Sequence, residues 1–168
     1  MLIRMIANVG RWDGSKPVHR EDATIWGDAV TDLKTTSNRL STWLANNDED
    51  IEDAIVALAL SRDKVQKMCY MILNEDILHE LGIELDEKKG EAPGLDKEIL
   101  KKHRDLVELD IKRLGMLSEY MINIAKTPEF ANWNKTEEEI NKLLIKYRDA
   151  KKINPAKVNK RLKEFLGW

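Results

Sequence analysis

The amino-acid sequence predicts an α+β fold that is mainly α-helical, with a small N-terminal β element packed on a body of four or five helices. Three observations lead to this prediction. Hydropathy alternates along residues 2–9, helical periodicity dominates after residue 46, and 42% of the 168 residues are hydrophobic while 35% are charged. A chain of this length buries enough apolar surface for one core, so we expect residues 1–168 to form a single domain.

The N-terminal part, residues 1–46, is expected to mix β and α structure. The alternation along residues 2–9 predicts a strand that ends at Gly10. Residues 23–34 combine a helical spacing of apolar side chains with several β-branched residues, so both helix and strand remain open there. A turn is expected at 34–38, and a second strand is expected at 40–45.

The middle part, residues 47–126, is expected to consist of core helices. Asn47 or Asp48 can cap a helix whose AIVALAL segment is apolar on every side, as expected for a helix surrounded by protein. The pattern predicts a further helix before Gly82, with a strand at 69–73 as the alternative. One long helix is expected near 96–126, because helical spacing continues until Pro128.

The last part, residues 127–168, is expected to form a basic helical hairpin. Thr136 can cap one helix, and Asn154 followed by Pro155 is a typical start of another. Residues 140–168 contain nine basic and two acidic residues, a net charge of +7, although the whole chain has a net charge of −2. This asymmetry indicates either an anionic partner for the basic part or its attraction to the acidic remainder of the chain.

The predicted long helix has two polar residues, His103 and Asp110, on its apolar face. Seven residues span about 10.5 Å along a helix, so these two side chains cannot hydrogen-bond to each other. Each has either an ordinary partner on a neighbouring element or a place in a polar pocket. In such a pocket His103 would act as a general base and Asp110 would orient a substrate, which makes them the candidate catalytic residues.

A polar run between apolar flanks is the candidate site for an anionic ligand. It consists of Lys34, Thr35, Thr36, Ser37, Asn38 and Arg39. Its hydroxyls, amide and cations are groups that bind phosphate. The run lacks the glycines of a phosphate-binding loop, however, and a turn between two strands accounts for the same residues.

Aromatic and basic residues supply the candidate partner-binding positions. They are Trp12, Trp26, Trp43, Lys157, Lys160 and Arg161. Packing in the core is the alternative for the tryptophans, and simple solvation is the alternative for the basic helix face. Nucleic-acid binding through the basic helices is disfavoured, because the net charge is slightly negative and no nucleic-acid recognition motif is found.

Other chemistry has little support in the sequence. Cys69 lies in an apolar run and is expected to be inert. Asp76 and His79 have a spacing known from metal sites, but the helix at 47–60 offers no further ligand in its interior, so we expect no metal and no cofactor. No motif of a well-known enzyme class is found, and no apolar run approaches the ~20 residues that span a membrane.

These patterns predict a noncatalytic, cytoplasmic module for protein–protein interaction or regulation, whose partner is another protein or a second copy of the chain, with no membrane contact. The alternative is a small enzyme or ligand-binding domain with a pocket lined by His103 and Asp110 for an anionic or phosphorylated small molecule. The third hypothesis is nucleic-acid binding through the basic C-terminal helices. Whether the chain is an enzyme remains open at this point.

Overall fold

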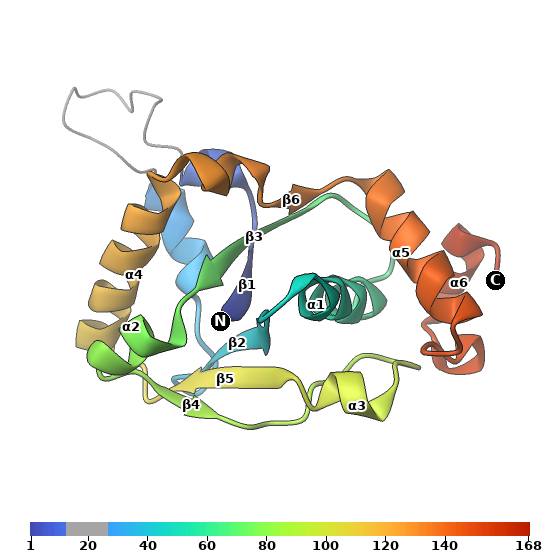
Figure 1. Ribbon diagram of the computed structural model, residues 1–168, viewed down its shortest axis with the longest axis horizontal. Helices are drawn as coiled ribbons and strands as arrows, with labels where there is room; N and C mark the ends of the chain where they lie inside the picture. Colours follow the sequence, from blue (N-terminus) through green and yellow to red (C-terminus); the bar gives the residue numbers. More distant parts are fainter. Residues whose placement is uncertain (13–26) are drawn as a thin grey trace.

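The computed structural model describes residues 1–12 and 27–168 (Figure 1). In this part of the chain the strands form one six-stranded antiparallel sheet. The strands are β1 (Leu2–Ile6), β2 (Leu40–Leu44), β3 (Met68–Leu73), β4 (Glu84–Asp86), β5 (His103–Val107) and β6 (Asn134–Lys135). Their order across the sheet is β4-β5-β2-β1-β3-β6, so β1 lies between β2 and β3.

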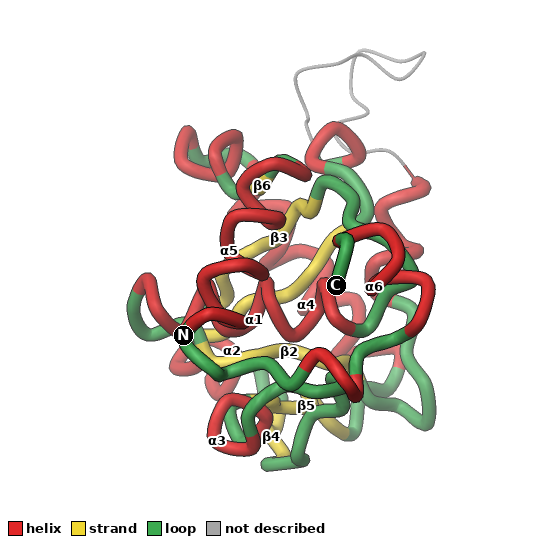
Figure 2. The backbone as a smooth tube through the Cα atoms, turned by 90° about the vertical axis from the view of Figure 1, so that its right-hand side faces the viewer, coloured by secondary structure: helices red, strands yellow, loops and turns green. Residues whose placement is uncertain are grey.

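Helices cover both faces of this sheet (Figures 1 and 2). One face packs against α1 (Asp48–Leu60), α3 (Lys97–Leu100), α5 (Glu137–Asp149) and α6 (Lys160–Leu166). The other packs against α2 (Glu75–Glu80), α4 (Ile111–Ala125) and the short helices η1 (Val9–Arg11), η2 (Gly27–Leu33) and η3 (Pro128–Asn132). A fourth short helix, η4 (Pro155–Lys157), precedes α6. The sheet is therefore the middle layer of three.

Alternation along the strands divides the apolar residues between two cores. In β1, Ile3 contributes to the core under α1, whereas Leu2 and Ile6 contribute to the core under α4. Strand β3 is apolar throughout because both of its faces are covered. Its adjacent residues Tyr70 and Met71, for example, pack into different cores. Such a continuous apolar run has no period-two signal.

The predicted fold class is wrong in its proportions. The sheet is not a small N-terminal element on a helical body, because it has six strands in the described residues and recruits them from the whole chain. Strands β3, β4 and β5 all lie within residues 47–126, where core helices were expected. At 69–73 the strand alternative is the one that the structure adopts, since β3 covers Met68–Leu73.

The long helix expected near 96–126 is also absent from the described structure. The region is divided into α3, strand β5 and helix α4. The chain reverses between β5 and α4 at Glu108, whose φ of 56° is left-handed, and neither glycine nor proline marks this turn in the sequence. The residues that would form the apolar face of the predicted long helix, with His103 and Asp110 among them, therefore belong to three different elements.

Several local predictions are confirmed. Strands β1 and β2 lie where period two predicted them, and Asn47 caps α1 by accepting from the backbone N–H of Asp50 at 2.9 Å. Thr136 and Glu139 form a complete capping box at the start of α5. In the region left open, residues 27–33 form the 3₁₀ helix η2, and residues 23–26 lie outside the described residues.

No helix in the described part of the chain is both long enough and apolar enough to cross a membrane.

Candidate functional site

The two candidate catalytic residues have different roles in the structure. His103 is the first residue of β5 and is 8% exposed. Asp110 is an exposed N-cap of α4, where its Oδ1 accepts from the backbone N–H of Arg113 at 2.7 Å. Asp110 thus has the ordinary structural role that was the alternative for it, and it lines none of the pockets described below. The carboxylate close to His103 belongs to Asp105.

Strand β5 places His103 and Asp105 on the same face because they are two residues apart. The register with the neighbouring strand pairs His103 with Trp43 and Asp105 with Ser41. These four side chains therefore gather on the α1 side of the sheet, while Leu106, the residue after Asp105, packs into the opposite core. A polar patch lies next to an otherwise apolar face.

This patch borders two adjoining pockets. The first, called here the His103 pocket, has a volume of about 290 Å³ and is lined by Ser41, Trp43, Leu58, Ser61, Lys88, Lys89, Gly90, Glu91, His103 and Asp105. The second, called the Arg39 pocket, has a volume of about 280 Å³ and is lined by Arg4, Lys34, Thr36, Ser37, Arg39, Leu40, Ser41, Lys88 and Asp105. The two pockets share Ser41, Lys88 and Asp105, so they are parts of one larger site.

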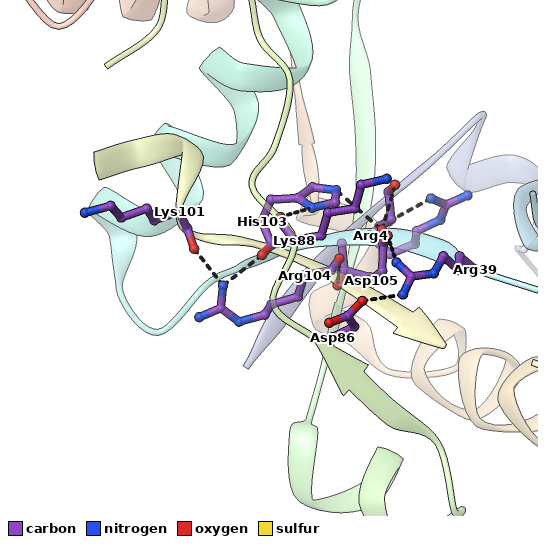
Figure 3. A network of polar contacts seen from close by, with 10 residues as sticks. Arg4, Arg39, Asp86, Lys88, Lys101, His103, Arg104 and Asp105 are labelled. Carbon is purple, nitrogen blue, oxygen red and sulfur yellow. Dashed lines mark hydrogen bonds and ion pairs between the residues drawn. The ribbon is translucent and has the colours of Figure 1, made fainter. Parts of the chain in front are cut away.

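His103 is oriented by the segment between β4 and α3. Its Nδ1 lies 2.7 Å from the carbonyl oxygen of Lys88, which can only accept, so Nδ1 bears the proton and donates it. The ring also packs edge-on against Trp43, with 5.1 Å between centroids. Because Nδ1 is engaged, Nε2 is the nitrogen that faces Asp105, 3.6 Å from its Oδ1. Figure 3 shows His103 and Asp105 side by side on β5.

Asp105 is the centre of the polar network in Figure 3, and it is only 4% exposed. Its Oδ1 accepts from the Ser41 hydroxyl at 3.2 Å, and its Oδ2 lies 3.3 Å from Arg39 Nη1. Arg39 also pairs with Asp86 through Nη2. The carboxylate is therefore surrounded by donors, as expected for a buried charge.

Arg4 adds a half-buried cation to the Arg39 pocket. It donates from Nη1 to the carbonyl oxygen of Ser41 and from Nη2 to that of Asp32, each at 2.8 Å, and its Nε has no partner among the described residues. Burial lowers the pKa of Arg4 to about 10, although the nearby negative charge of Asp32 acts in the opposite direction. Arg4 is therefore still charged at neutral pH, and within residues 1–12 and 27–168 it donates to backbone carbonyls rather than to a carboxylate.

The predicted anion-binding run forms a tight turn before β2. Ser37 and Asn38 both have positive φ, and the backbone groups of Thr36 and Arg39 exchange two hydrogen bonds across them. This is the geometry of a type I′ hairpin turn. Of the six residues predicted, Lys34, Thr36, Ser37 and Arg39 line the Arg39 pocket, whereas Thr35 and Asn38 do not. The same residues can therefore form the turn and line a ligand-binding pocket.

The candidate partner-binding residues have different environments. Trp12 is 1% exposed and donates from its indole to Asp32, and Trp43 is 5% exposed beside His103. Trp26 lies outside the described residues. The three basic residues lie at the C-terminal end: Lys157 lines a further pocket, Lys160 lies 3.8 Å from Glu164, and Arg161 pairs with Asp63 at 3.0 Å.

Sequence reasoning missed Asp105, Ser41, Lys88 and Arg4. The signal for Asp105 was its position two residues after His103, but the helical interpretation placed these two side chains on different faces. Lys88 and Arg4 have no local signal, since they reach the site through the order of the strands. For metal binding, no group of three His, Cys, Asp or Glu side chains within residues 1–12 and 27–168 is arranged to hold an ion.

Comparison of this chain with protein-family models, with curated protein sequences and with solved structures gives no match. Its function must therefore be argued from the site itself.

Proposed function

We propose that this protein binds a small anionic molecule, with a phosphate as the charged group, across the Arg39 and His103 pockets. The observation that supports the proposal is that the two pockets share one wall but differ in character. Four cationic residues line the Arg39 pocket against a single carboxylate, Asp105, whereas Trp43 and Leu58 give the His103 pocket an apolar wall. A ligand with one charged end and one apolar end fits both parts.

Asp105 does not cancel the positive charge of this site. Asp105 is 4% exposed, and its carboxylate accepts from the Ser41 hydroxyl and from Arg39, which is shared with Asp86, so one negative charge remains against the other three cations of the pocket. The cations that remain for a ligand are Arg4, Lys34 and Lys88, because the ammonium groups of the two lysines make no ion pair with a described residue. Three such cations around a concave surface are suited to a doubly charged phosphate.

His103 is the group at this site that could take part in chemistry. Its Nδ1 proton is held by the carbonyl oxygen of Lys88, which fixes the ring and directs Nε2 toward the shared wall beside Asp105. A fixed imidazole at the junction of a charged and an apolar subsite can donate to a ligand oxygen or accept its proton. The function proposed for this site is ligand binding. Catalysis by His103 would be a separate property, and turnover of the bound ligand would reveal it.

The first experiment uses phenyl phosphate and inorganic phosphate as probes, with binding measured by isothermal titration calorimetry at low ionic strength. We expect phenyl phosphate to bind more tightly than phosphate, because its ring buries apolar surface against Trp43 and Leu58. The double variant Lys34→Gln/Lys88→Gln should weaken both ligands by roughly tenfold or more, as is typical for the loss of charged hydrogen bonds. The control variant Lys112→Gln/Lys126→Gln makes the same change in net charge at exposed positions elsewhere.

A second variant tests His103 while keeping its hydrogen bond to the Lys88 carbonyl. His103→Asn keeps an N–H group that can donate to the Lys88 carbonyl but removes Nε2. We expect weaker binding of phenyl phosphate and a fall of about 0.5 to 1.5 kcal/mol in the free energy of unfolding, because the edge-on contact with Trp43 is lost. The proposed function is wrong if neither probe binds, or if the Lys34/Lys88 variant and its control bind equally well.

A further inference from the structure

A third pocket lies where α3 and the segment before it meet the connection between α5 and α6. This lysine pocket has a volume of about 590 Å³, larger than either pocket described above. Its lining consists of Lys89, Ala92, Gly94, Leu95, Asp96, Lys97, Glu98, Leu100, Lys151, Lys152, Asn154 and Lys157. Five lysines thus oppose two acidic residues.

Backbone contacts hold the two walls of the lysine pocket together. The N–H of Asn154 donates to the carbonyl of Gly94 at 2.8 Å, and the N–H of Asp96 donates to the carbonyl of Lys152 at 2.9 Å. A Cβ at Gly94 would lie 2.6 Å from the carbonyl oxygen of Asn154, so the walls approach as closely as glycine allows. The lysines on both walls are therefore displayed by a fixed backbone rather than by a loose tail.

Most charges around this pocket are not balanced locally. Glu98 pairs with Lys101, which lies outside the pocket lining, and Asp96 caps α3 by accepting from the backbone N–H of Glu98. Lys152 pairs with Glu49 at 2.8 Å. The remaining four lysines form no side-chain hydrogen bond or ion pair with any residue that the structure describes. They are Lys89, Lys97, Lys151 and Lys157.

We propose that the lysine pocket binds the phosphate backbone of a single-stranded nucleic acid. Four uncompensated ammonium groups on two facing walls complement a chain with a phosphate at every nucleotide, whereas a concave pocket is poorly shaped for the convex surface of a duplex. Lys89 also lines the His103 pocket, so a flexible strand can continue from one pocket to the next. The proposal does not require that the phosphate site around Arg39 functions as proposed.

The test measures fluorescence anisotropy of a labelled 20-nucleotide thymidine strand as a function of salt. Four phosphate contacts on a single strand predict that affinity falls roughly 50-fold between 50 and 200 mM salt. The triple variant Lys97→Gln/Lys151→Gln/Lys157→Gln leaves one contact, so its affinity should be lower at 50 mM and should fall only about threefold over the same range. The control Lys64→Gln/Lys112→Gln/Lys126→Gln changes the net charge equally at exposed lysines outside the pocket and should behave as the wild type.

Three results would overturn the proposal. One is the absence of binding at 50 mM salt, and another is equal weakening by the triple variant and its control, which would mean that only net charge matters. The third is that inorganic tripolyphosphate binds as tightly as the 20-nucleotide strand, which would assign the pocket to a small polyphosphate. Circular dichroism of both triple variants checks that they are folded. Phenyl phosphate binding by the Lys97/Lys151/Lys157 variant should be unchanged, which separates this proposal from the one for the Arg39 pocket.

Discussion

Gly90 offers a direct test of how the candidate site is built. A Cβ at this position would lie 2.5 Å and 2.9 Å from two ring carbons of Trp43 and 3.0 Å from Cβ of His103. Ordinary carbon contacts are about 3.5 to 4.0 Å, so the methyl group of Gly90→Ala overlaps the indole by about 1 Å. The indole is 5% exposed and cannot move away easily, so we expect the Lys88–Gly90 segment to move instead.

The cost of this movement can be estimated. Overpacking a buried contact costs about 1 to 3 kcal/mol, and replacing glycine returns about 0.4 to 1 kcal/mol by restricting the unfolded chain. We therefore expect Gly90→Ala to lower the free energy of unfolding by about 1 to 2 kcal/mol. The movement also disturbs the hydrogen bond from His103 to the Lys88 carbonyl, so phenyl phosphate should bind more weakly.

Gly115→Ala is the matched control. Gly115 lies within α4 and an added Cβ would meet nothing within 4 Å, so the same substitution should stabilise the protein by about 1 kcal/mol through helix propensity. Urea unfolding followed by tryptophan fluorescence measures both. With a slope of about 2 kcal/mol per molar urea, the midpoint should fall by about 0.5 to 1 M for Gly90→Ala and rise by about 0.5 M for Gly115→Ala. Midpoints that shift in the same direction would refute the packing argument.

Two further predictions concern an N-cap and the tyrosines. Asp110→Ala should lower the free energy of unfolding by about 1 kcal/mol through loss of the α4 cap, and Asp110→Ser should largely restore the cap. Neither substitution should change phenyl phosphate binding. A loss of binding with intact stability would show that Asp110 belongs to the site. Burial is the largest cause of the raised pKa of each tyrosine, so the neutral phenols are favoured in the folded state. Their contribution to stability should be fully present below pH ~10 and lost as the pH rises further. Absorbance at 295 nm should show less phenolate at pH 10 in the folded protein than in the protein unfolded by urea, and equal phenolate in the two states would contradict this. The residues concerned are Tyr70, Tyr120 and Tyr147.

Helix ends and amphipathic strands were predictable because their signals are local. Asn47 and Thr136 cap helices through hydrogen bonds to residues three positions away, so the sequence itself contains both partners. Strand β5 was not predictable in this way. It pairs with β4 on one side and with β2, at least 60 residues earlier, on the other. The turn that ends it uses Glu108 in a left-handed conformation that is uncommon for this residue type.

The site was predictable only in part for the same physical reason. His103 and four residues of the Lys34–Arg39 run were recognised because they are polar residues in apolar surroundings. Their proximity depends on β5 pairing with β2, a long-range contact that no local pattern encodes. Asp105 illustrates the consequence: under helical periodicity it is on a different face from His103, and under strand periodicity it is on the same face.

The uneven charge of the chain has two physical outcomes in the fold. Part of the basic C-terminal region neutralises acidic residues near the two ends of α1, through Lys146 with Glu52, Lys152 with Glu49 and Arg161 with Asp63. Exposed pairs of this kind contribute little to stability individually. Their arrangement still matters, because acidic partners are occupied by these residues while Lys151 and Lys157, which come from the same basic region, remain without a partner among the described residues at the lysine pocket. Within this one segment, Lys146 and Lys152 therefore form ion pairs inside the chain, whereas Lys151 and Lys157 are left for the proposed contact with an external polyanion.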